Sequence, residues 1–320
     1  MDKSLVYEME DEINIMKKHV FLILAHNNPE YLTRLVKMLD AANHFFFIHI
    51  DKKNEILLEN PLMKRLNKKE NCRIISRVTV NWGGFSQVQA TLALIRESLE
   101  SAQSFDWFHL ISGCDLPLVS PLMLDEMIER QKFKGYVGLA SSSNDLSKMK
   151  KLCLRYRIYH FNDFANRRKH NLKTMLCRVV EVLEKKISNI GLYLRPDINM
   201  PVYKGSQWWS LRRDVVDYIM FFLQENAWYQ KRFLWTSCID EIFFHTIIFN
   251  SKLKKKKKKN NHRYVDWRKL RKNDKPPRVL TEEDIPLILA KNCWFARKTD
   301  PQKSSKLIKY FEEELKKNAQ

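Results

Sequence analysis

The sequence predicts an α/β protein whose central sheet is largely parallel. Two apolar runs, His19–Ala25 and Phe45–Ile50, have the length of strands and no polar alternation, which is typical of strands buried on both faces. Between them, residues 30–42 place apolar side chains on one helical face. Because a strand, a helix and a strand in this order pair in parallel, the opening of the chain predicts an open α/β sheet.

The same alternation continues through the first half of the chain. In order, we expect a helix at 57–66, a strand at Cys72–Ser76, a long helix at 85–101 and a strand at Trp107–Ser112. The loop Gly113–Pro117 then lies at the carboxyl end of that last strand. In open α/β sheets ligands bind at this edge, so the loop is a candidate part of a site.

The second half of the chain is less regular. Residues 141–200 are basic, contain a helix-like stretch at 176–187 and predict an insertion over the sheet. Further elements are expected as a Trp-rich strand at Ser206–Leu211, an apolar helix opening at Asp240, a strand at Arg263–Trp267 and a helix at Glu282–Ala290. The domain prediction is an N-terminal arm (1–18), one domain (19–300) with a basic loop at 252–262, and a C-terminal amphipathic helix (301–320) that docks onto it.

Charge restricts the partners. The formal net charge is +20 and the pI about 9.6, which favours an anionic partner: nucleic acid, an anionic membrane or a phosphorylated substrate. Seven lysines lie in the run Lys252–Lys259. Such a run is most often a solvated loop, and it could also hold the protein against anionic lipid.

Cysteine spacing and hydropathy predict the compartment. The six cysteines are widely spaced without a C-x-x-C pair, which argues against a zinc site or redox motif and favours reduced thiols in a cytosol. No apolar stretch approaches the roughly 20 residues that cross a bilayer, and the acidic segment Glu8–Glu12 is unlike a signal peptide. We therefore expect a cytoplasmic protein.

Several common site motifs are missing from the sequence. There is no D-x-D triplet to hold a divalent cation, no G-x-G-x-x-G or Walker A loop, and no G-x-S-x-G elbow. His49 and Asp51 share one strand face and could ligate an ion, although a lone pair is a weak signal. Arg278 and Arg297–Lys298 could stabilise a departing diphosphate in place of a metal, and a solvated basic face is the alternative.

Asp240 and Glu241 precede an apolar run of helical spacing. A carboxylate in this position can cap a helix N-terminus, where the helix dipole also favours negative charge. Capping is the more common role of such a carboxylate, and a helix start facing a strand end can also hold one carboxylate inside a cleft. Both interpretations remain open from these residues.

Taken together, the motifs resemble one family, the core-2/I-branching β-1,6-N-acetylglucosaminyltransferases, which include the peptide O-xylosyltransferases. The resemblance extends from about His19 to Asp300. It rests on seven segments in the same order: Ala25–Pro29, Ile48–Asp51, Val80–Gln89, Ile111–Pro117, Gly205–Trp209, Asp240–Glu241 and Phe295–Lys298. The segment from Ser141 to Pro201 does not match well, so the resemblance leaves the acceptor open.

The resemblance implies a fold and a set of site residues. The expected fold is GT-A-like, a nucleotide-sugar-binding mixed sheet with helices on both faces, acting without a metal ion or other cofactor. Glu241 matches the catalytic base. The expected donor-binding residues are Ala25, His26, Asp51, Trp82, Asp115, Arg278, Arg297 and Lys298. The expected acceptor-binding residues are Gly205, Ser206, Gln207, Trp208, Tyr264 and Trp267.

The function this implies is metal-independent, inverting transfer of a sugar, foremost N-acetylglucosamine, from a UDP-sugar to a hydroxyl of a glycan or glycolipid. The alternatives are a UDP-xylose-dependent enzyme of the same family and a basic protein that binds nucleic acid or membrane without catalysis. Because no nucleic-acid-binding motif is visible, we expect no nucleic acid partner. A bacterial-type relative without an anchor, cytoplasmic or peripheral on the inner membrane face through Lys252–Lys259, is the expected context.

Overall fold

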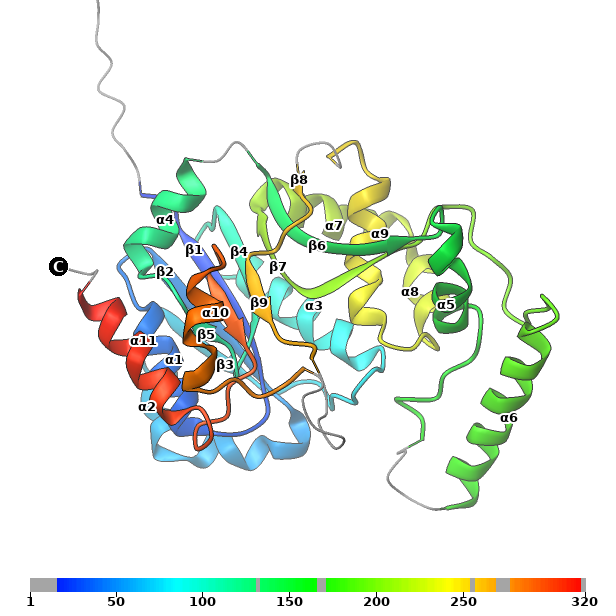
Figure 1. The fold of residues 1–320 in the computed structure, drawn as a ribbon, viewed down its shortest axis with the longest axis horizontal. Coiled ribbons are helices and arrows are strands. Elements are labelled where there is room, and N and C mark those ends of the chain that lie inside the picture. Colours follow the sequence, from blue (N-terminus) through cyan, green and yellow to red (C-terminus); the bar gives the residue numbers. More distant parts are fainter. Residues whose placement is uncertain (1–15, 131–132, 166–170, 254–256, 269–276, 318–320) are drawn as a thin grey trace, which may run out of the picture.

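The computed structural model describes residues 16–130, 133–165, 171–253, 257–268 and 277–317 (Figure 1). Within these ranges a seven-stranded sheet has the order β3-β2-β1-β4-β7-β6-β8, and a three-stranded sheet has the order β5-β10-β9. The large sheet comprises β1 (His19–Ala25), β2 (His44–Ile50), β3 (Cys72–Ile75), β4 (Trp107–Ser112), β6 (Gly135–Ser142), β7 (Tyr203–Arg212) and β8 (Lys257–Lys258). The small sheet comprises β5 (Leu116–Pro117), β9 (Arg263–Val265) and β10 (Phe295–Arg297).

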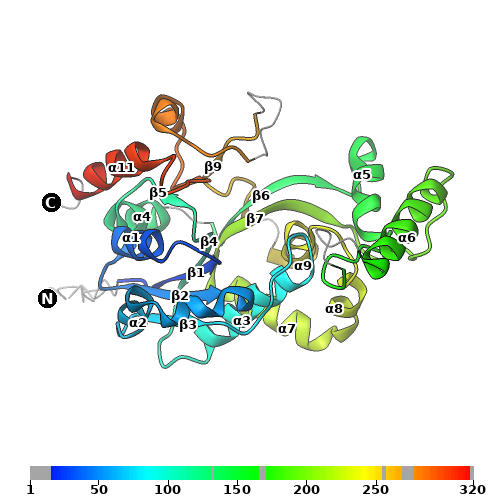
Figure 2. The same cartoon turned by 90° about the horizontal axis from the view of Figure 1, so that it is seen from below.

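Helices cover both faces of the large sheet (Figure 2). The α-helices are α1 (Pro29–Leu39), α2 (Pro61–Asn67), α3 (Ser86–Leu99), α4 (Pro121–Glu129), α5 (Leu146–Tyr156), α6 (Leu172–Ser188), α7 (Arg213–Glu225), α8 (Ala227–Phe233), α9 (Phe243–Asn250), α10 (Ile285–Leu289) and α11 (Ser305–Lys317). Among the described residues, 3-10 helices include η1 (Lys52–Glu59), η2 (Ile239–Glu241) and η4 (Glu282–Asp284). None of the described helices is long and apolar enough to cross a membrane.

The first strand is buried on both faces, as its continuous apolar sequence predicts. Val20 and Leu22 pack with α3, α7 and α9, whereas Phe21 and Ile23 pack with α1, α4 and α11. Strand β1 pairs in parallel with β2 and β4. The predicted fold class is therefore confirmed, with its mixed character supplied by β7, which runs antiparallel to both β4 and β6.

In-register pairing brings three strand ends to one edge. Ala25 lies opposite Ile50 on β2, and Leu24 lies opposite Ser112 on β4. The predicted site segments that follow these strands therefore share the carboxyl edge of the sheet.

The segment around Asp240 corrects the expected helix start. Ile239–Glu241 forms a 3-10 turn, α9 begins only at Phe243, and the Asp240 side chain caps neither element. Cys238 precedes the turn with a positive φ of 47°, and its backbone N–H donates to the carbonyl of Gly83 at 2.9 Å. This bond fixes the chain before a helix can begin, so the capping interpretation of Asp240 is wrong.

The basic segment 141–200, predicted as an insertion over the sheet, contains one strand end and two helices. It supplies the end of β6, the helix α5 and the helix α6, which projects from the body of the molecule (Figure 1). The C-terminal helix α11 buries Leu307, Ile308 and Phe311 in the cluster that also holds Phe21. Residues 1–15 of the predicted arm lie outside the described ranges.

Gly205 on β7 is required by close packing. A Cβ atom at this position would overlap the carbonyl oxygen of Gly138 on β6 and Nε2 of the buried His245 on α9. We expect Gly205→Ala to lower the free energy of unfolding by about 3 kcal/mol, the upper range for overpacking a tight core. Chemical denaturation measures this.

Gly135→Ala is the matched control on the neighbouring strand, because the nearest atom to its added Cβ is the end of the Leu211 side chain. Equal losses of stability in the two variants would show that the β6–β7 approach at Gly205 is not a special constraint.

Candidate active site

A cleft of about 750 Å³ opens among β6, β7, η2 and β9. Its wall carries four cationic and two acidic side chains: Arg155, Lys204, Arg263, Arg297, Asp240 and Glu241. Trp82 and Trp267, which are 80% and 62% exposed, also line it. An excess of positive charge in a concave site favours an anionic ligand, and exposed aromatic rings offer flat surfaces to a sugar or base.

Glu241 is held by cations from two different elements. Its Oε2 lies 2.6 Å from Nη1 of Arg155 on α5 and 3.0 Å from Nζ of Lys204 on β7. Within the described residues Oε1 accepts no protein hydrogen bond, and the side chain is 25% exposed. One carboxylate oxygen is therefore anchored while the other is open to the cleft.

The loop before α3 positions the turn that carries Glu241. Gly83 adopts a positive φ of 72°, and its carbonyl accepts bonds from Cys238 N–H and from the Asn162 side chain at 2.7 Å. A Cβ on Gly84 would overlap the carboxylate of Asp163. Because neither glycine has a side chain, Asn162 and Asp163 can pack closely against this loop, which in turn contacts the chain at the start of η2.

Asp240, beside Glu241, is a buried acid. Its side chain is 8% exposed and its Oδ1 has no hydrogen-bond partner among the described residues. Burial and then the nearby charge of Glu241 raise the pKa of Asp240 to about 7. The cleft therefore contains adjacent carboxyl groups in different environments, an arrangement common at sites of proton transfer.

Arg297 is fixed from both sides. Its Nη1 lies 3.2 Å from Oδ1 of the fully buried Asp115, and its guanidinium lies 4.1 Å from the ring centroid of Trp208. Burial raises the pKa of Asp115, and Arg297 opposes that rise. Asp115 thus orients a cation at the cleft wall rather than facing the cleft itself.

The structure brings about half of the predicted site residues together. The cleft is lined by Glu241 and by Trp82, Gly205, Ser206, Gln207, Trp208, Trp267 and Arg297. The residues that do not line it are Ala25, His26, Asp51, Asp115, Tyr264, Arg278 and Lys298. Of these, Ala25, His26 and Asp51 lie at the carboxyl edge of β1 and β2, and Tyr264 lies within β9.

His49 and Asp51 are occupied by backbone groups rather than arranged as metal ligands. His49 Nε2 accepts the Val78 N–H at 3.1 Å, and Asp51 Oδ1 accepts the N–H groups of Lys53 and Val80, each at 3.1 Å. Burial lowers the pKa of His49 to about 4, which keeps the ring neutral and able to accept. The pair ties the chain after β3 to the end of β2.

The two basic residues Arg278 and Lys298, near the C-terminal end of the domain, differ in their partners. Arg278 pairs with Asp266 at 2.9 Å and with Asp284, so its charge is already compensated. Lys298 follows Arg297, and its ammonium has no ion-pair partner in the part of the chain that the structure describes. Lys298 is thus the cation more available to a ligand.

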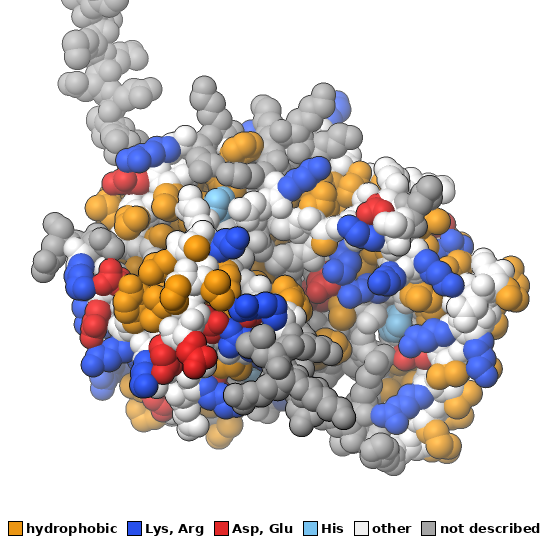
Figure 3. Space-filling view, viewed as in Figure 1, with side chains coloured by type: hydrophobic (Ala, Val, Ile, Leu, Met, Phe, Trp, Pro, Cys, Tyr) orange, Lys and Arg blue, Asp and Glu red, His pale blue; other side chains and the backbone are white. Residues whose placement is uncertain are grey.

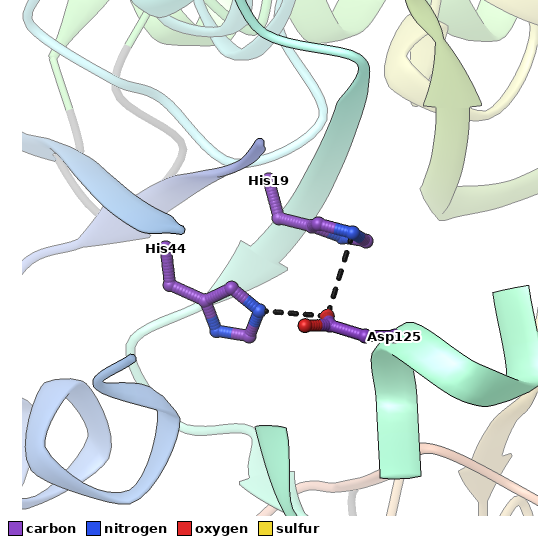
Figure 4. A group of neighbouring side chains, drawn as sticks. All are labelled: His19, His44 and Asp125. Atoms are coloured by element: carbon purple, nitrogen blue, oxygen red, sulfur yellow. Dashed lines mark hydrogen bonds and ion pairs between the residues drawn. The ribbon is translucent and has the colours of Figure 1, made fainter. Parts of the chain in front are cut away.

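Within the described ranges, His19, His44 and Asp125 form the group with metal-ligand chemistry, their ligand atoms lying within 4.8 Å of one another (Figure 4). His44 Nε2 lies 2.9 Å from Asp125 Oδ1, and His19 Nδ1 lies 3.0 Å from His109 Nε2. Burial lowers the pKa of His19 to about 3. These contacts link the side chains as a buried hydrogen-bonded cluster at the amino ends of β1 and β2, outside the cleft.

Sequence reasoning missed Arg155, Lys204 and Arg263 as site residues. Nothing local distinguishes Arg155 from the other basic residues of its segment, because its contact spans 86 positions. Lys204 carried a usable signal, since it directly precedes the glycine of a Trp-rich strand. Arg263 is buried, and its guanidinium donates to Ser210 Oγ at 3.0 Å and to the Trp209 carbonyl at 3.1 Å.

Comparison with known proteins identifies relatives. A Xylosyltransferase of Ciona intestinalis is 24% identical over 258 residues, covering 78% of this chain and 27% of the relative. Xylosyltransferase 1 of Rattus norvegicus is 26% identical over 266 residues, covering 81% of this chain and 29% of the relative. This chain therefore spans only about a quarter of the length of these relatives.

The apo crystal structure of mouse Xyloside xylosyltransferase 1 aligns with a TM-score of 0.32 and 10% identity, covering 73% of this chain and 81% of that one. This similarity is too low to support the fold, which rests on the strand order above. The family model described as Core-2/I-Branching enzyme matches residues 20–289. Since that match covers most of the chain, the protein belongs to the Core-2/I-Branching enzyme family.

Proposed function

We propose that the protein is an inverting glycosyltransferase that moves a sugar from a UDP-sugar to a hydroxyl group of a glycan or glycolipid, without a divalent metal ion. The observation that carries the proposal is Glu241, a carboxylate anchored through one oxygen and open through the other, in a cationic cleft lined by tryptophans. A general base needs this combination of fixed position and access to the substrate proton.

The proposed reaction is a single displacement. Glu241 Oε1 accepts the proton of the acceptor hydroxyl as that oxygen forms a bond to C1 of the donor sugar. The bond from C1 to the UDP oxygen breaks on the opposite side, so the configuration at C1 inverts. Arg155 and Lys204 keep the carboxylate oriented by holding Oε2.

The leaving diphosphate requires positive charge on its side of the cleft. Arg297 lies at the cleft wall, oriented by Asp115, and Lys298 is the adjacent cation without an ion-pair partner among the described residues. The resemblance also places Arg278 here, but Asp266 and Asp284 already bind its guanidinium. We therefore propose that Arg297 and Lys298 stabilise the negative charge of the departing UDP. Arg278 instead holds the chain around β9 through its ion pairs.

The acceptor is assigned to the tryptophan side of the cleft. Trp267 is 62% exposed at the cleft and can stack on the apolar face of a sugar ring. Gly205, Ser206 and Gln207 line the wall on β7 close to Lys204, which contacts Glu241. We propose that these groups present the acceptor hydroxyl to the base, with Tyr264 supporting Trp267 from β9.

Two donor sugars remain candidates. UDP-N-acetylglucosamine follows from the family resemblance and is the donor we propose. UDP-xylose is the second candidate, favoured because the relatives reported above are named xylosyltransferases. Ala25, His26, Asp51 and Trp82 are the residues we assign to the nucleotide end.

We further propose a cytoplasmic location with contact to the inner membrane face. All six cysteines are free thiols, which supports a reducing compartment. Lys254–Lys256, in the centre of the basic run, lie outside the described residues, so contact with lipid through that run stays a prediction.

Asp240 is expected to make stability depend on pH. Its raised pKa, about 7, means that the folded protein keeps this proton when the unfolded chain has already lost it. As pH rises from about 4 to 7, the unfolded state therefore gains an advantage and the free energy of unfolding falls.

The first prediction for the proposed function concerns removal of the base. Glu241→Gln should lower transfer by roughly 10²–10⁴-fold, because the amide cannot accept the proton, while UDP affinity is retained. A UDP-release assay with isothermal titration of UDP measures both. Glu97→Gln is the matched control, because Glu97, like Glu241, pairs with two cations, here Arg73 and Arg77, but lies outside the cleft. Near-normal turnover of Glu241→Gln would refute the base assignment.

Donor binding is the second prediction. UDP should bind equally well in EDTA and in Mn²⁺, and Lys298→Ala should weaken that binding about tenfold, as expected for one lost charge contact of roughly 1.4 kcal/mol. The exposed Lys291→Ala serves as the control. Calorimetric titration that shows a strict Mn²⁺ requirement, or unchanged affinity for Lys298→Ala, would contradict the metal-free donor site.

The third prediction concerns Asp240→Asn. The variant should lose the pH dependence described above, so that between pH 5 and pH 8 its stability relative to the parent rises by about 2–3 kcal/mol. Urea unfolding at each pH measures the difference. The exposed Asp217→Asn should leave the parent's pH dependence in place, and parallel curves for all three proteins would disprove the assignment.

A further inference from the structure

The outward face of α6 is not used by the proposed reaction. The helix projects from the body of the molecule on the side away from β1 and α11 (Figures 1 and 2). Its outward residues are apolar and recur at spacings of three and four: Leu172, Met175, Leu176, Val179, Val182 and Leu183. Each is between 50% and 67% exposed. An exposed apolar stripe of this kind marks an interaction surface.

The inward face of α6 is acidic instead of apolar. Glu181 and Glu184 are 7% and 4% exposed. Glu181 Oε1 accepts the N–H of Phe161 at 3.2 Å, and Glu184 Oε2 accepts the N–H of Tyr159 at 2.6 Å. Rotating the helix to bury its apolar side would break both bonds and remove the acceptors of these partly buried N–H groups. The outward direction of the apolar stripe is therefore fixed by the structure.

The exposed charges of α6 indicate an anionic partner. Both glutamates of α6 are buried, whereas Lys173, Lys185 and Lys186 are exposed. Figure 3 shows hydrophobic and basic side chains gathered over this part of the molecule. A second copy of the chain would bring the same cations against them and be repelled. A surface of anionic lipid offers the opposite charge together with an apolar layer for the stripe.

We propose that α6 is an interfacial helix that docks the protein on an anionic lipid surface, its leucines and valines entering the headgroup boundary and its lysines meeting lipid phosphates. This contact is separate from the lysine run at 252–259 and does not depend on the chemistry assigned to Glu241.

The test is flotation of the full chain with vesicles of phosphatidylcholine alone or mixed equally with phosphatidylglycerol. We expect binding to the mixed vesicles and little to the neutral ones. The double variant Leu176→Gln, Leu183→Gln should reduce the partition coefficient at least tenfold. Both side chains are more than half exposed, so the variant should fold. The lysine run is intact in it and cannot account for the loss.

The matched control is Leu287→Gln, Leu289→Gln, which changes two leucines of α10 that are 43% and 58% exposed. It should bind vesicles like the parent. Parent-like binding by the α6 variant, or equal parent binding to both vesicle types, would overturn the proposal. A dimer interface on α6 would also overturn it. In that case the parent sediments as a dimer without lipid, and the α6 variant, unlike the control, sediments as a monomer but still binds vesicles.

Discussion

The site depends on one shared oxygen, Oε2 of Glu241, which binds Arg155 from α5 and Lys204 from β7. A partly buried carboxylate is costly without compensating charge, and two cations at hydrogen-bond distance supply it. Because those cations come from elements far apart in sequence, the pairing also fixes where α5 and β7 meet. The carboxylate of Glu241, which we propose as the base, and the cleft wall formed by α5 and β7 are thus held by the same contact.

Two glycines, Gly205 and Gly83, shape the backbone so that Lys204 can contact Glu241. The close approach of β6 and β7 at Gly205 places Lys204 beside the turn that carries Glu241. On the other side of the turn, Gly83 receives the N–H of Cys238, which stops a helix from starting early and leaves Glu241 in a 3-10 turn. The glycines of these motif segments therefore have a role in backbone geometry.

Sequence reasoning succeeded where a pattern is local. The apolar runs of β1, β2 and β4 predicted strands buried on both faces, and the helix between β1 and β2 followed from its period. The helix α7 was overlooked although Val215, Val216, Ile219 and Leu223 show the same period.

Long-range contacts could not be predicted in this way. The pairing of Arg155 with Glu241 and the occupation of Arg278 by two carboxylates depend on tertiary placement that no spacing encodes. For the same reason the pattern could not separate Asp240, buried with a pKa near 7, from Glu241, compensated and accessible.

The helix α6 has an orientation that its sequence pattern alone does not predict. Its sequence is amphipathic, and burying the apolar face is the default expectation for such a helix. Here two backbone N–H groups, at Tyr159 and Phe161, have acceptors only if the glutamates turn inward. Satisfying those donors directs the apolar side to the exterior, where the adjacent lysines give it a preference for anionic surroundings. Positive charge thus occurs both in the cleft and on this helix, and these two regions suit anions of different kinds.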